Sequence, residues 1–100
     1  RVLFRIGVTY DTPYEKLKEI PELIKKIIDG VQNVRFGRTH FCSYGAYSLD
    51  FEIAYYILSN DYDTYLDLNQ EVNYRIKEEF DKRGIQFAFP TQTLQVHHEA

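Results

Sequence analysis

Hydrophobic residues alternate with polar ones in four stretches of the chain and recur at three- and four-residue steps in two others. Alternation is typical of strands with one buried face, whereas the longer spacing is typical of amphipathic helices. The predicted strands cover about residues 2–10, 34–47, 48–59 and 85–89. One helix is predicted between the first and second strands and another between the third and fourth.

The first predicted helix follows Asp11-Thr12-Pro13. Asp11 or Thr12 can cap the exposed N–H groups, and Pro13 suits the first turn. Pro21 lies inside the helix and predicts either a kink or a division into a short first turn and a longer second piece. The apolar stripe of this helix consists of Leu17, Ile20, Ile24, Ile27, Ile28 and Val31.

The second and third strands read as a long antiparallel hairpin with its turn at Gly45-Ala46. Alternation in the second strand breaks down after Phe36, and a bulge near Gly37 or Arg38 would restore the phase. The third strand alternates cleanly, with Asp50 and Glu52 opposite its apolar face. That apolar face carries Leu49, Phe51, Ile53, Tyr55 and Ile57.

The second helix is predicted from the acidic capping cluster Asn60-Asp61-Tyr62-Asp63 to Gly84, which can stop a helix because glycine tolerates a left-handed conformation. The strand Ile85–Phe89 follows, and Pro90 ends it because proline cannot donate to a ladder. The stripe of the second helix consists of Tyr65, Leu68, Val72, Ile76 and Phe80.

This order predicts an α+β fold, a ferredoxin-like βαββαβ sandwich with an antiparallel sheet and two helices on one face. The first and third strands should lie in the middle, with the last strand beside the first. We expect residues 1–90 to form the ferredoxin-like domain and residues 91–100 to form a C-terminal tail. The tail alternates from Thr91 to about His97 but has no partner left within the domain, so its strand would present unpaired backbone groups.

Composition narrows the class of protein. One hundred residues suit a single domain, and the net charge of −3 argues against a surface that binds phosphate backbones or anionic membranes. The single cysteine, Cys42, cannot form an internal disulfide. No apolar run approaches the roughly twenty residues that span a bilayer. Because the chain begins at Arg1, we expect it to be a piece of a longer protein.

Arg5 shares the helix-free face of the predicted sheet with Asp50 and Glu52. The favoured interpretation is a cross-strand charge pair, and an anion site built on Arg5 is the alternative.

The sequence gives little evidence for a metal site. Arg35, Arg38 and His40 form at most a small basic patch, and His97-His98 point to opposite faces of a strand. Asp61, Asp63 and Asp67 lack the glycine and glutamate of a calcium loop, so capping explains them better. We therefore predict no metal site and no cofactor.

Catalytic motifs are also missing from the sequence. It contains no nucleophile–histidine–acid set, no zinc-protease pair and no glycine-rich phosphate loop. The acids of the third strand occupy the positions where RNA-binding relatives of this fold stack bases, which argues against nucleic acid. We expect a protein that is not an enzyme.

Four stretches together resemble the C-terminal cytoplasmic α/β domain of the small-conductance mechanosensitive channel (MscS) family. They are Ile6-Gly7-Val8-Thr9-Tyr10-Asp11, the hairpin Ser43–Glu52, the helix Asn69–Phe80, and the closing Gly84-Ile85-Gln86-Phe87-Ala88-Phe89-Pro90. The membrane helices and middle β domain of that family would lie upstream of Arg1.

The resemblance implies a homo-heptamer whose α/β domains form a cage on the cytoplasmic face of the membrane, with side openings for ions and small solutes. The membrane would be contacted only through upstream segments. The segment after the last proline would build a small barrel with one strand from each subunit. The implied oligomer interface consists of Phe89, Pro90, Thr91, Gln92, Thr93, Leu94, Gln95 and Val96.

Two other functions stay open at this point. A regulatory module could bind a small ligand between paired ferredoxin-like domains, although Asp11-Thr12-Pro13 lacks the glycine for a close approach. An enzyme of the acylphosphatase type would need an arginine in a phosphate loop after the first strand, where the chain instead has Thr9-Tyr10-Asp11.

Overall fold

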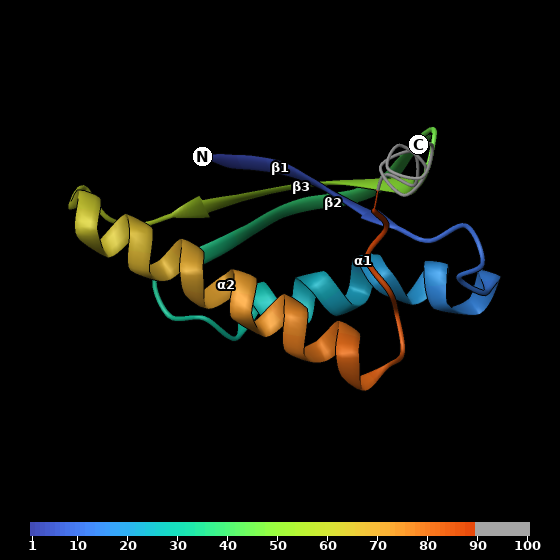
Figure 1. Cartoon of the computed structure of the whole chain (residues 1–100). Helices are drawn as coiled ribbons and strands as arrows, with labels where there is room; N and C mark the ends of the chain where they lie inside the picture. The colour runs from blue at the N-terminus through green and yellow to red at the C-terminus, as the bar shows by residue number, and fades with distance from the viewer. Residues whose placement is uncertain (90–100) are drawn as a thin grey trace, which may run out of the picture.

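Two helices pack on one face of an antiparallel sheet (Figure 1). The computed structural model describes residues 1–89. The strands are β1 (Val2–Val8), β2 (Val34–Tyr44) and β3 (Leu49–Ile57), and the helices are α1 (Tyr14–Asp29) and α2 (Tyr62–Lys82). The predicted strand limits were therefore too long by up to three residues at their ends. Neither helix within residues 1–89 is long and apolar enough to cross a membrane.

The sheet has the order β1-β3-β2, with β3 pairing antiparallel to both neighbours. The predicted hairpin is confirmed, as is the bulge, because the β2–β3 register shifts between Phe36 and Arg38. A Cβ on Gly37 would lie 2.6 Å from the carbonyl oxygen of Ala54, so only glycine fits there without a shift. A second register shift, between Phe41 and Ser43, was not predicted.

The last predicted strand lies beside β1, as expected, but is reduced to one antiparallel bridge between Val8 and Phe87. Around it, Thr9 N–H donates to the Gln86 carbonyl at 3.1 Å and Ala88 N–H donates to the Gly7 carbonyl at 2.9 Å. This segment completes the ferredoxin-like arrangement and confirms the fold class, although it forms no regular strand.

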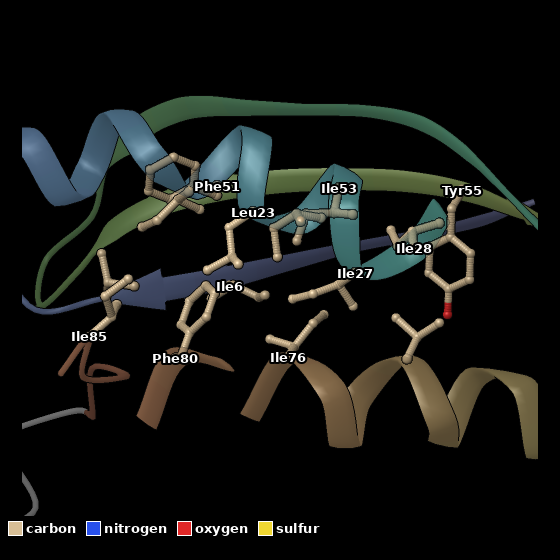
Figure 2. Packing of buried hydrophobic residues seen from close by; sticks show 14 of the residues in the cluster. Ile6, Leu23, Ile27, Ile28, Phe51, Ile53, Tyr55, Ile76, Phe80 and Ile85 are labelled. Carbon is tan, nitrogen blue, oxygen red and sulfur yellow. The ribbon is translucent and has the colours of Figure 1, made fainter. Parts of the chain in front are cut away.

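The hydrophobic core lies between the sheet and the helices (Figure 2). Tyr55 on β3 is fully buried, and burial raises the pKa of its phenol to about 12. Its hydroxyl donates to Asn69 Oδ1 on α2, which pairs the buried polar group. The largest fully buried side chains are those of Tyr55, Phe51, Phe80, Ile20, Ile24, Ile28, Ile53, Val8 and Val72.

The start of α1 differs from the prediction. Pro13 is the N-cap, and no side chain caps the helix. The Asp11 carboxylate instead accepts a hydrogen bond from the Thr9 hydroxyl at 2.7 Å, and the Thr12 hydroxyl lies 3.3 Å from that of Thr9. Local pairing with Thr9 therefore replaces capping.

Pro21 does not divide α1, which runs through it for 16 residues. Proline removes one intrahelical hydrogen bond. Burial of the neighbouring Ile20, Leu23 and Ile24 against the sheet holds the turn together.

The ends of α2 agree with the prediction. Asp61 is the N-cap and accepts from the Thr64 N–H at 2.9 Å. These hydrogen bonds from Thr64 keep the pKa of the Asp61 carboxyl below its ordinary value. At the other end Gly84 has φ +70°, and Ile85 N–H donates back to the Phe80 carbonyl at 2.9 Å.

Candidate assembly surface

The chain leaves the sheet at Phe89, whose side chain is 76% exposed. Just before it, the Phe87 ring packs on Phe80 of α2, so the exit point is anchored to the core. Phe89 is the only predicted interface residue within the described part of the chain. Outside the described residues lie Pro90, Thr91, Gln92, Thr93, Leu94, Gln95 and Val96.

Pro90 prevents the pairing with β1 from being extended. Ala88 N–H donates to Gly7, and the next bond of this kind would come from residue 90 two positions later. Proline has no N–H to give. Within residues 1–89, the outer edge of β1 before Gly7 has no paired strand. Such an edge, with its unpaired backbone groups, is a template for another strand.

A charge cluster lies on the helix-free face of the sheet. Glu52 forms ion pairs with Arg38 at 2.9 Å and with Arg5 at 3.9 Å, which confirms the predicted cross-strand pairing. Hydrogen bonding from Arg38 holds the pKa of the Glu52 carboxyl below its ordinary value, and the field of both arginines adds to this. Because Arg5 faces a carboxylate, the cluster is better suited to holding strands together than to binding an anion.

Asp50 does not join this cluster. Its carboxylate accepts hydrogen bonds from Ser43 Oγ at 3.1 Å and Ser48 Oγ at 2.5 Å. These bonds close the hairpin turn, so Asp50 acts in turn geometry rather than in a cross-strand ion pair.

The other polar residues considered for a binding site, Arg35, Arg38 and His40, do not converge on a common point where they could bind a ligand. Arg35 lies over the Tyr56 ring at 4.6 Å from its centroid, Arg38 pairs with Glu52, and His40 lies opposite Glu52 in the register. Within residues 1–89, no group of three or more His, Cys, Asp or Glu side chains could hold a metal ion. His97-His98 lie outside the described residues.

Sequence reasoning missed the structure of the hairpin tip, which we define as residues 43–48 with Tyr10. The Tyr10 hydroxyl donates to the Gly45 carbonyl, and Gly45 N–H donates to the Ser48 carbonyl at 2.6 Å. A Cβ on Gly7 would lie 2.8 Å from Ser48 Cβ, so the tip packs closely against β1. The signal in the sequence was the coincidence of Gly7, Gly45 and several tyrosines, but which segments meet is decided only by the fold.

Beside the tip is an open notch of about 350 Å³. It is lined by residues from β1, the hairpin and the chain exit, including Gly7, Gly45, Tyr47, Asp50, Ala88 and Phe89. The exit point and the hairpin tip therefore share one surface feature.

The family described as mechanosensitive ion channel MscS, C-terminal, matches residues 2–87, which is nearly the whole described fold. Two similar proteins come from Methanocaldococcus jannaschii. The small-conductance mechanosensitive channel MscMJ is 44% identical over 95 residues, and the large-conductance mechanosensitive channel MscMJLR is 44% identical over 99 residues.

An MscS family protein of Aquifex aeolicus is 39% identical over 100 residues. The matches cover 94% to 96% of this chain but 27% of each relative. The chain therefore spans about a quarter of the length of these relatives.

Proposed function

This chain belongs to the MscS family of mechanosensitive ion channels, and from that we propose that it forms the cytoplasmic cage domain of such a channel. The observation that carries the proposal is the match of residues 2–87, which ends where the chain leaves the sheet. The domain would sit on the cytoplasmic face of the membrane, with the membrane contacted through other segments of the channel.

In this proposal the domain acts through assembly. Thr91–Val96 of each copy would pair with the same segment of its neighbours, and a closed ring of identical strands leaves no open edge. A heptameric ring is the form proposed for the full channel. The anchoring of Phe87 on Phe80 supports this, because it fixes the segment that immediately precedes each tail.

Within the cage, ions and small solutes would pass through openings between neighbouring domains on their way to the pore. The domain would contribute no catalysis. The paired state of the charged side chains supports a structural surface, since Glu52, Asp50 and Asp61 each hold partners within the fold.

A chimeric channel tests the proposal. The matching segment of MscMJ would be replaced by this chain, and the product purified, weighed by native mass spectrometry and reconstituted in liposomes. We expect a single oligomer of the same stoichiometry as MscMJ, with tension-gated conductance. Efflux of solutes of graded size from the liposomes would then measure filtering. A chimera that stays monomeric would contradict the assembly role.

The tail strand is tested by a matched pair of double variants in that chimera. Leu94 and Val96 share one face of an alternating strand, whereas Thr93 and Gln95 share the other. Leu94→Asp with Val96→Asp should break the oligomer if the apolar face lines a barrel. Thr93→Asp with Gln95→Asp adds the same charge and should disturb assembly less. Equal stability of both double variants would contradict the barrel.

A further inference from the structure

We propose that the hairpin tip and its notch form a docking surface for a neighbouring copy of this chain. The inference rests on the proposed assembly and adds a second contact to it, separate from the tail strand. It assigns to the tip a role in joining domains, with Tyr44 and Tyr47 as the anchoring side chains.

Hydrogen bonds within its own chain hold the tip. The Tyr10 hydroxyl ties the turn to the end of β1 through the Gly45 carbonyl, and two serine hydroxyls hold the Asp50 carboxylate. The carboxylate is thereby paired within its own chain. A preorganised surface loses little conformational entropy on association.

Large aromatic side chains at the tip are left in solvent. Tyr44 is 75% exposed, and Tyr47, which lines the notch together with Phe89, is 39% exposed. The Tyr44 ring packs edge-to-face against the Phe41 ring. Phe41 in turn stacks on the fully buried Phe51, which links Tyr44 to the core. Exposed aromatic residues on a rigid base are typical of the anchors of protein interfaces.

The occupant follows from where the chain continues. Phe89, the last described residue, lines the notch, and the segment that pairs with a neighbour in the proposed assembly begins at Thr91, two residues later in the sequence. A neighbour that pairs with the tail from Thr91 onward is therefore brought next to the tip. A cyclic ring joins two different patches of each subunit, which suits a surface with no twofold symmetry of its own.

Sedimentation equilibrium of the 100-residue chain, taken into the millimolar range, tests the docking surface. The variant Tyr44→Ser with Tyr47→Ser should weaken self-association at least tenfold. The matched control is Tyr62→Ser with Tyr74→Ser, which removes two exposed tyrosines from α2. Thermal unfolding of both variants verifies that each keeps its fold.

Cys42 supplies a second readout because it is a free, exposed thiol on β2 next to Phe41. Its rate of alkylation by a maleimide should fall as the chain associates, and should fall less in the Tyr44→Ser, Tyr47→Ser variant. The control variant should show the wild-type protection.

The outcomes separate this inference from the proposed function. If Leu94→Asp with Val96→Asp abolishes association while the tip variant associates like wild type, the docking surface is overturned and the tail strand stands. If only the tip variant weakens association, the docking surface is supported and the pairing of tail strands is not. A wild-type chain that remains monomeric throughout overturns it. A second result would also overturn it. If the chain is monomeric and Leu94→Asp with Val96→Asp raises the rate of Cys42 alkylation above that of wild type, the chain's own tail covers the tip.

Discussion

The ring of Phe87 lies on the ring of Phe80 with their centroids 5.1 Å apart and their planes 9° from parallel. Phe80 is fully buried on α2, and Phe87 forms the bridge to Val8 of β1. This stack therefore joins the helix layer, the sheet and the chain exit at one point. It holds the last described segment in place where a regular strand is missing.

Replacement of Phe87 tests that anchoring. Phe87→Ala should lower the free energy of unfolding by about 2 kcal/mol, because it removes a partly buried ring and an aromatic pair. Phe89→Ala is the matched control, and since Phe89 is largely exposed its effect should stay within about 0.5 kcal/mol. Urea denaturation measures both. Similar losses for the two variants would show that the stack does not anchor the exit.

Periodicity was sufficient to predict the order of elements and the layer arrangement. The stripes of both helices and the apolar face of β3 are local patterns, and all their residues except Tyr65 lie in the core or pack against it. The bulge at Gly37 was also predictable, because alternation fails there within a few residues. These features depend on neighbouring residues in the sequence.

Features that depend on distant pairing could not be predicted. Gly7 matters because Ser48, far away in the sequence, lies against it. The failure of Asp11 to cap α1 is a local effect, since its carboxylate accepts a hydrogen bond from Thr9 instead. The last strand is reduced to a bridge, and Pro90 has no N–H with which to extend it. Of the predicted interface, only Phe89 could be placed.

Gly84 offers a test of backbone conformation alone. Its φ of +70° is left-handed, yet a Cβ there would meet nothing within 4 Å. Gly84→Ala should therefore cost about 1 kcal/mol of stability from conformational strain without any clash. Gly84→Asn should cost less, because asparagine tolerates this region better. Thermal unfolding compares the two, and an alanine variant as stable as wild type would contradict the left-handed helix end.

The charge cluster predicts a pH dependence. Because Arg38 holds the pKa of Glu52 below its ordinary value of 4.5, ionised Glu52 stabilises the fold above that value. This contribution is lost as the pH falls through the lowered pKa. Removing the guanidinium with Arg38→Gln should therefore raise the pKa of Glu52, as measured by NMR titration of its side-chain carbon.

The control for that titration is Arg5→Gln. Arg5 lies 3.9 Å from Glu52 and donates no hydrogen bond of the kind that Arg38 supplies, so its removal should raise the pKa less. The destabilisation caused by Arg38→Gln at neutral pH should also disappear in acid, where Glu52 is protonated. A destabilisation that persists there would assign it to lost packing of the arginine stem.

Replacing Thr39 with valine should stabilise the fold. Thr39 lies on β2 opposite Ile53 and is 8% exposed, and its hydroxyl has no hydrogen-bond partner among the described residues. An unpaired buried hydroxyl costs free energy that an apolar group of the same shape does not. Thr39→Val should therefore raise the free energy of unfolding by about 1 kcal/mol, and valine also suits a strand. Thr39→Ser keeps the hydroxyl but loses the methyl group, so it should destabilise. Urea denaturation of both variants decides the matter, because a destabilised valine variant would mean that the hydroxyl is hydrogen-bonded in solution.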